Sequence, residues 1–123
     1  MKIEKKNGEL EEILEMLKRA TADKTPLSPK VSYAIIKNKL AIETALQAFY
    51  KAKEEIITKY SDGKGQITAA ESPEAFVAAN VEINIISKEV TELEISTIKL
   101  SELGENDLPL NLIAALGFMI VEG

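Results

Sequence analysis

The longest regular pattern of hydrophobic positions lies between Ser28 and Gly63. Ser28 and Pro29 are typical of a helix start, because a serine hydroxyl can accept a hydrogen bond from a free backbone N–H and proline suits the first helical position. No glycine or proline follows before Gly63, which predicts about 30 residues of helix, roughly 45 Å long. Residues at alternating four- and three-residue spacing form one seam along it: Asn38, Ile42, Ala45, Phe49, Ala52 and Ile56. Such a seam predicts a second helix packed along the first.

The second helix of this pair is predicted from Pro73 to about Lys88, where Ser72-Pro73 repeats the same kind of start. Its stripe has the complementary three- and four-residue spacing: Phe76, Ala79, Ile83, Ile86 and Val90. The connection 61–72 contains the turn-forming run Ser61-Asp62-Gly63. We therefore expect the two helices to pack antiparallel. Asn38, in the seam, would need a hydrogen-bond partner if it is buried; a solvated end of the seam is the alternative.

Shorter patterns predict elements at both ends of the chain. Met1–Lys6 and Thr91–Leu100 alternate as strands do, and we expect them to pair with each other. Asn7 is predicted to cap a first helix that ends near Ala22, before the breaker 23–26. The apolar face of that helix is Leu10, Ile13, Leu14 and Leu17. After a break at 104–107, Pro109 opens a last helix with the apolar residues Leu112, Ile113, Leu116, Met119 and Ile120.

These elements define the predicted fold class. The chain of 123 residues is expected to form a single domain, 1–123, that is mainly α (α+β). Its centre is a long antiparallel helical hairpin, accompanied by a short N-terminal helix, a C-terminal helix and a small two-stranded antiparallel β-ribbon. The C-terminal helix is apolar enough to belong to the core, and any part left uncovered is a candidate partner surface.

Composition removes several kinds of chemistry. The chain has no Cys and no His. Thiolate nucleophiles, Cys-based metal sites and the commonest general base are therefore excluded. Any catalysis would depend on Asp, Glu, Lys, Tyr, Ser or Thr, so a small carboxylate-dependent enzyme stays an alternative. The sequence itself predicts a non-enzyme with no catalytic, cofactor-binding or metal-binding residues and no cofactor.

The net charge and its distribution along the chain indicate which kinds of partner are expected. The net charge is −5, with 12 Lys or Arg against 9 Asp or Glu in residues 1–60 and 3 against 11 in 61–123. An acidic protein does not favour nucleic acid as a partner, whereas opposite halves can attract each other within one fold or between subunits. The start Met1–Lys6 does not have the pattern of a secretory signal, and no run is apolar enough to span a membrane. The expected location is cytoplasmic, without membrane contact.

The connection after the long helix resembles a calcium-binding EF-hand loop over residues 60–71. Gly65, Ile67 and Glu71 stand at the sixth, eighth and twelfth positions, and Asp62 stands at the third. Tyr60 replaces the first acidic ligand, and Lys64 places a positive charge at the fifth position. Because calcium needs six to eight oxygen ligands, we predict a glycine-rich turn and retain a degenerate calcium module as the alternative.

Two kinds of charged group, lysine pairs and glutamate groups, are candidate sites. Lys37-Lys39 and Lys51-Lys53 lie on the long helix near Tyr33 and Tyr50, but interleaved glutamates and the absence of arginine there argue against a nucleic-acid stripe. Acidic groups such as Glu11-Glu12 with Glu15, and Glu54-Glu55, fall on predicted solvent faces where nothing apolar raises a pKa.

The order of segments resembles small uncharacterised proteins encoded by tailed phages and prophages. The resemblance includes Met1 to Glu4, Leu27 to Leu40, the Ser-Asp-Gly turn, Glu94 to Leu100 and Leu108 to Leu116. It transfers no functional residue. It implies a phage- or prophage-derived protein that acts through contacts, in particle assembly or on a host factor, in the host cytoplasm or in the virion. The sequence thus predicts an interaction protein with a helical surface for another protein or for a second copy of itself.

Overall fold

The computed structural model describes residues 1–22, 26–61, 63–103 and 108–122. In chain order the elements are β1 (Lys2–Lys6), α1 (Asn7–Ala22), α2 (Pro29–Tyr60), α3 (Pro73–Ser87), β2 (Val90–Glu94), β3 (Ile98–Lys99), α4 (Leu110–Leu116) and β4 (Ile120–Val121). Short 3₁₀ helices span Leu100–Leu103 and Gly117–Met119. The predicted class is confirmed, since helices dominate, α2 is long and β1 and β2 form a two-stranded antiparallel sheet.

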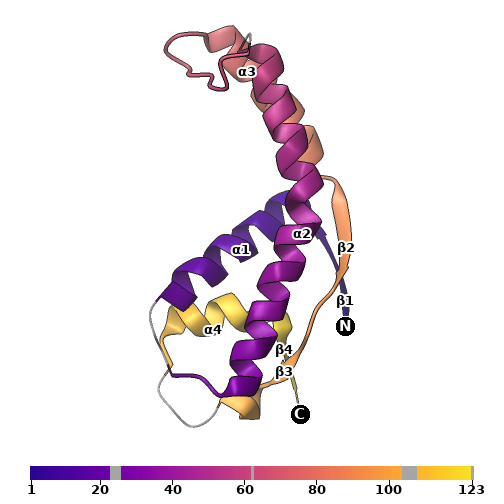
Figure 1. Cartoon of the computed structure of the whole chain (residues 1–123), viewed down its shortest axis with the longest axis vertical. Helices are drawn as coiled ribbons and strands as arrows, with labels where there is room; N and C mark the ends of the chain where they lie inside the picture. Colours follow the sequence, from indigo (N-terminus) through magenta and orange to yellow (C-terminus); the bar gives the residue numbers. More distant parts are fainter. Residues whose placement is uncertain (23–25, 62, 104–107, 123) are drawn as a thin grey trace.

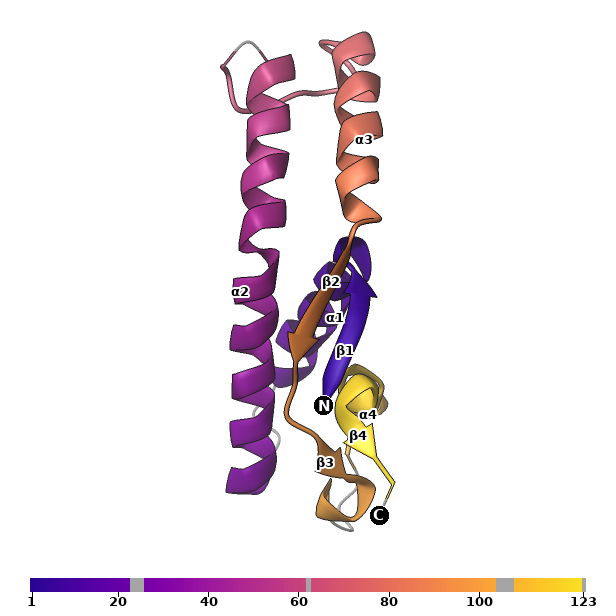
Figure 2. The same ribbon diagram turned by 90° about the vertical axis from the view of Figure 1, so that its right-hand side faces the viewer.

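Two parts of the molecule share α2 (Figures 1 and 2). In the part that we call the body, α1 and β2 pack on the first half of α2, α4 packs on α1, β1 pairs with β2 and β3 pairs with β4. In the part that we call the arm, α3 (Pro73–Ser87) and the second half of α2 lie antiparallel and extend away from the body. The predicted hairpin therefore exists, but α3 follows only the second half of α2.

The start of α2 follows the sequence prediction. The Ser28 hydroxyl accepts a hydrogen bond from the Val31 N–H at 3.3 Å, and Pro29 is the first helical residue. The helix then continues for 32 residues. Ser61 ends it, and its N–H donates to the Ile57 carbonyl.

The core lies in the body. Leu10, Leu14 and Leu17 of α1 are almost fully buried, as their spacing predicts. They belong to one apolar cluster with residues of α2, α4, β3 and the second 3₁₀ helix, namely Val31, Ile35, Ile42, Leu46, Ile98, Leu112, Leu116 and Met119. The last helix is thus part of the core, as expected, although it ends at Leu116. Met119 belongs to a 3₁₀ turn and Ile120 to β4, which corrects the longer helix predicted from the sequence.

The residues of the predicted α2 seam face two different neighbours, the body and α3. Asn38, Ile42 and Phe49 are buried, and Phe49 belongs to the body core. Ile56 is half-buried. Asn38 is 1% exposed and lies away from any solvated end: its Nδ2 donates to the Ser96 carbonyl at 2.8 Å, and its Oδ1 accepts from the Ser96 N–H at 2.7 Å. One amide side chain therefore binds both backbone polar groups of a single residue, Ser96, on the opposite segment.

The β-structure differs in part from the prediction. β1 and β2 pair antiparallel with Lys2 opposite Glu94, as expected. The predicted strand to Leu100 is interrupted, because residues after Ile95 lie beyond β1 in this register and the Ser96 backbone is bonded to Asn38 instead. β3 then pairs parallel with β4, with Ile98 opposite Ile120, a contact that the sequence did not indicate.

Asn7 has a different role from the predicted cap. It is the first residue of α1 and is 8% exposed. Its Nδ2 donates to the Ile86 carbonyl at 2.9 Å, and its Oδ1 accepts from the Thr91 hydroxyl at 2.6 Å. The Asn7 amide thus connects the start of α1 to the junction between α3 and β2. These two long-range hydrogen bonds take the place of a local helix cap.

Candidate interaction surface

Helix α3 is apolar on more than one side. It begins at Pro73, and alanine, valine and isoleucine dominate its 15 residues. A helix that is apolar all round is normally enclosed by protein. In the arm, however, α2 lies along one side of α3 (Figure 2). Within this fully described helix, Ala79 alone is buried.

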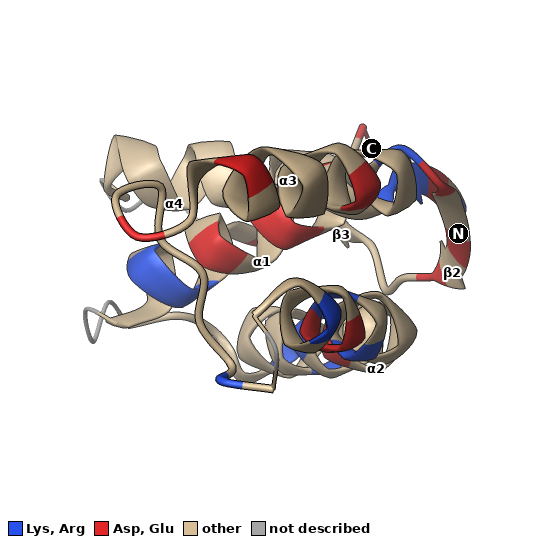
Figure 3. Ribbon diagram, turned by 90° about the horizontal axis from the view of Figure 1, so that it is seen from above, with Lys and Arg blue, Asp and Glu red and all other residues tan. Residues whose placement is uncertain are grey.

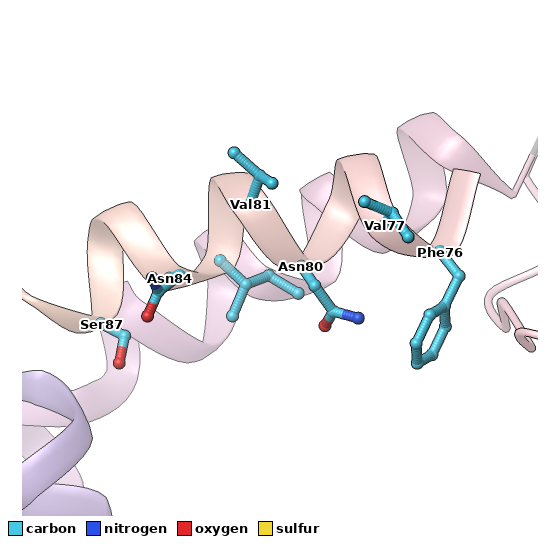
Figure 4. Close-up of a pocket in the computed structure, with 7 residues that line it drawn as sticks. Phe76, Val77, Asn80, Val81, Asn84 and Ser87 are labelled. Carbon is cyan, nitrogen blue, oxygen red and sulfur yellow. The ribbon is translucent and has the colours of Figure 1, made fainter. Parts of the chain in front are cut away.

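The uncovered side of α3 forms a row that we call the outer face: Val77, Val81 and Ile85. Their exposed fractions are 62%, 57% and 60%. The spacing of four residues keeps them on one side of the helix. In Figure 4, Val77 and Val81 project to one side of α3, whereas Phe76 and Asn80 project to the other. The outer face is therefore a continuous branched apolar row.

Beside the outer face is a shallow groove of about 520 Å³. Phe76, Asn80, Asn84 and Ser87 contribute to its lining (Figure 4). Phe76 also borders a second hollow, of about 340 Å³, between α3, the end of α2 and residues 65–68. The predicted stripe member Phe76 is thus 37% exposed at the rim, because α2 ends near this level. Val90, the last predicted member of the stripe, does not belong to α3. It lies in β2 and is 58% exposed.

Polar contacts hold the two helices of the arm together near its end. The Lys59 Nζ lies 3.3 Å from the Glu82 Oε1. Hydrogen bonding from Tyr60, followed by the Lys59 contact, lowers the pKa of Glu82. The same contacts with Glu82 raise the pKa of Lys59 and the pKa of Tyr60. This cluster faces α2, so it leaves the outer face free of its charges.

The connection 60–71 contains the predicted glycine-rich turn. Gly63 and Gly65 have positive φ angles of 83° and 76°, which glycine adopts without strain. The Ser61 hydroxyl accepts from the Gly65 N–H at 3.1 Å. Tyr60, at the first position of the EF-hand comparison, interacts with Glu82. Asp62 lies outside the described residues. Among the described ones, no group of three or more acidic side chains is arranged to hold a metal ion.

The lysines of the candidate nucleic-acid stripe do not share one environment, as the contacts of Lys37 and Lys53 show. Lys37 lies over the Tyr33 ring, 5.4 Å from its centroid. Lys53 lies 3.2 Å from the Glu11 carboxylate and also over the Phe49 ring. Contacts with a carboxylate and with a ring engage these two cations, which does not favour a phosphate-binding row.

The acidic group of α1 lines a cleft of about 720 Å³ between α1 and α2. Glu12 and Glu15 are exposed, as predicted, and Glu11 is partly covered by its contact with Lys53. Burial, and then the nearby carboxylates of Glu11 and Glu15, raise the pKa of Tyr50. A tyrosine hydroxyl with a raised pKa is a weaker acid than usual and stays protonated near neutral pH.

The outer face was missed at the sequence level, although its signal was present. The heptad spacing predicts the stripe through Ala79, whereas the second row, at 77, 81 and 85, has four-residue spacing and lies outside that stripe. A second exposed apolar row, Tyr33, Ile36 and Leu40, lies on the first half of α2, with exposed fractions of 64%, 54% and 58%. Lys37 packs over its tyrosine, so this row is partly covered by a charged side chain.

Figure 3 places the charges around the two helices of the arm, in a view along the arm. Acidic residues are marked on α3, and both signs are marked on α2. Within the described residues, no helix, α2 included, has an apolar stretch that could cross a membrane. Comparisons of the chain with protein-family models, with curated proteins and with solved structures found no match.

Proposed function

We propose that this chain is a non-enzymatic interaction protein whose partner binds the outer face of α3. The observation that carries the proposal is the row of Val77, Val81 and Ile85, each more than half exposed on a projecting arm. Single exposed apolar residues are common on protein surfaces, but a contiguous row of branched side chains marks an interaction site. Burial of such side chains by a partner contributes roughly 1.5–3 kcal/mol each when it is complete.

The position of the row supports contact with a macromolecule. The arm extends beyond the body, so a partner helix can approach α3 without displacing the core (Figure 2). Helix-in-groove recognition uses apolar residues at three- and four-residue spacing, and the outer face has this spacing beside a groove with Asn80 and Asn84. Polar residues at the edge of an apolar row give such a surface its rim.

Two surface carboxyl groups have pKa shifts opposite to the direction that acid catalysis near neutral pH needs. A carboxylic acid that acts near neutral pH needs a raised pKa. The pKa values of Glu82 and Glu102 are instead lowered, by Tyr60 in the first case and by Lys30 in the second. Because the order of segments resembles that of phage and prophage proteins, we propose particle assembly or modulation of a host factor as the setting.

The proposal is tested by affinity capture from host cells, with quantitative mass spectrometry. The tagged chain is compared with the triple variant Val77→Gln, Val81→Gln, Ile85→Gln. The matched control is Tyr33→Gln, Ile36→Gln, Leu40→Gln, which removes an equally exposed row. A specific partner, either another protein or an untagged second copy of the chain, is expected with the parent and the control, and its recovery should fall at least about tenfold with the α3 variant. Equal recovery with all three proteins would contradict the assignment of the outer face.

A further inference from the structure

The outer face of α3 is symmetric about Val81. Val77 and Ile85 lie four residues before and after it, and Glu74 and Lys88 lie seven residues before and after it. At about 100° per residue, all five positions fall within roughly 40° of one line along the helix. The row therefore begins with a carboxylate, continues through three apolar residues and ends with an ammonium group.

Both terminal charges are available to a partner. Glu74 and Lys88 are exposed. Among the ion pairs of the described residues neither takes part, whereas Glu82 on the α2 side of the same helix is paired with Lys59. The free charges of α3 thus lie on the apolar row, and the paired charge lies towards α2.

From this pattern we infer that α3 binds the α3 of a second copy of the chain, antiparallel and about a two-fold axis through Val81. The inference rests on the proposed function and specifies the partner for its site. In this arrangement Val81 meets its own copy, and Val77 of each copy meets Ile85 of the other. Glu74 of each copy lies opposite Lys88 of the other, so two attractive pairs close the ends.

The charges also select the direction of pairing. A parallel pair would place Glu74 against Glu74 and Lys88 against Lys88, and like charges in contact oppose association. A partner helix of unrelated sequence would have to supply a lysine, three apolar residues and a glutamate in the matching order. A second copy supplies this order by symmetry.

The interface is small, because it contains one helix from each copy. Interfaces below about 1,200 Å² belong to weak or transient complexes, so we expect a dimer in the micromolar range or weaker. Sedimentation equilibrium of the full chain is therefore measured from about 10 μM to about 1 mM, at physiological ionic strength so that the net charge of each copy is screened. A monomer–dimer equilibrium is expected. A monomer throughout this range, or open-ended association, would overturn the inference.

Charge reversal tests the register. Glu74→Lys alone and Lys88→Glu alone each turn two attractive pairs into repulsive ones, and each should weaken the dimer by roughly tenfold or more. The double variant Glu74→Lys, Lys88→Glu exchanges the two charges and should restore the parent affinity. Circular dichroism shows whether each variant keeps its helix content. A dimer that does not respond to the single reversals, or that the double reversal does not rescue, would overturn the antiparallel arrangement.

The two-fold axis has its own test. Val81→Glu places two carboxylates at the axis and Val81→Lys places two ammonium groups there, so each variant alone should be monomeric. An equimolar mixture of the two should form a heterodimer with one opposite pair at the axis. Failure of the mixture to associate, while the parent dimerises, would place the contact elsewhere.

Failure of this inference can be told apart from failure of the proposed function. If the purified chain is monomeric but host capture still depends on the outer face, the second copy is wrong as the partner and the interaction surface stands. If neither self-association nor capture depends on the outer face, both are wrong.

Discussion

At the residue scale, Asn38 shows how a buried amide can connect distant segments. It is almost fully buried, and both its polar atoms bond to the backbone of Ser96, 58 residues away. The Nδ2 also lies 3.3 Å from the Met119 Sδ. A buried polar side chain is stabilising only when its hydrogen bonds are satisfied, and here they are. Asn38 therefore contributes to stability through the backbone groups that it satisfies.

Replacement of Asn38 by Ala should destabilise the chain by about 2–4 kcal/mol, because the partly buried Ser96 N–H and C=O would both lose their hydrogen-bond partner. Urea unfolding followed by circular dichroism measures the loss. The matched control is Asn84→Ala, an exposed asparagine of α3 whose replacement should change the free energy of unfolding by no more than about 0.5 kcal/mol. Equal effects of the two substitutions would contradict the role of Asn38.

A second residue-scale prediction concerns the end of the arm. Tyr60 is the largest cause of the lowered pKa of Glu82. Tyr60→Phe removes the hydroxyl and should therefore raise the Glu82 pKa towards its ordinary value, as measured by NMR titration of the side-chain carboxyl. Tyr33→Phe, on the body half of α2, is the control and should leave that pKa unchanged.

The sign of the pH dependence follows from the same shift. A carboxylate whose pKa is lower in the folded chain stabilises the fold above the ordinary carboxyl range, and this contribution is lost as pH falls through the lowered pKa. The contact of Glu82 with Lys59 and Tyr60 should therefore weaken on acidification. An acid titration in which α2–α3 contacts strengthened as Glu82 became protonated would be inconsistent with the cluster described above.

At the scale of elements, α3 combines high hydrophobicity with little burial. Ala79 is its one buried residue, and Val77, Val81 and Ile85 face outwards. The triple change of these three residues to Gln should therefore alter the free energy of unfolding of the monomer by at most about 1 kcal/mol, since glutamine is also the better helix former. Thermal unfolding at low protein concentration measures this.

The matched comparison is Leu14→Ala in α1. Leu14 is 1% exposed, so its truncation leaves a cavity and should cost about 2–5 kcal/mol. A large loss of stability in the α3 variant would mean that the outer face packs within the chain rather than against a partner.

The elements also show what the sequence could specify. The start and length of α2 were predictable because Ser28 and Pro29 act locally and no glycine or proline interrupts the helix. β3 and β4 were not, since each has two residues and their parallel pairing depends on the placement of α4. The prediction that Asn7 is a cap is wrong, because its side chain binds Ile86 and Thr91, which are far away in the sequence.

The sequence predicted a helical interaction surface, but it did not identify the residues that form this surface. A helical surface was expected, and heptad spacing led to the stripe that includes Ala79. Spacing identifies the faces of a helix, but which face is covered depends on the neighbours. Since α2 covers one side of α3 at the arm, the row through Val81 is left exposed.

At the scale of the whole molecule, stability is unevenly distributed. The core joins α1, α4, the strands and the first half of α2, whereas the arm is a two-helix extension (Figure 1). Regions with few buried apolar contacts open locally at a lower free energy than the core. Backbone amides of α3 should therefore exchange hydrogen through local opening, well before amides around Leu10, Leu14 and Leu17.

Native-state hydrogen exchange with residue resolution measures this difference. At low protein concentration, where the monomer dominates, protection in α3 should be clearly smaller than in α1. Because a partner that binds only the folded arm stabilises it by mass action, protection of α3 should rise with protein concentration if two copies pair through the outer face. The α1 amides lie in the body and serve as the internal control. Equal protection of α1 and α3 at every concentration would mean that the arm and the body unfold as one unit.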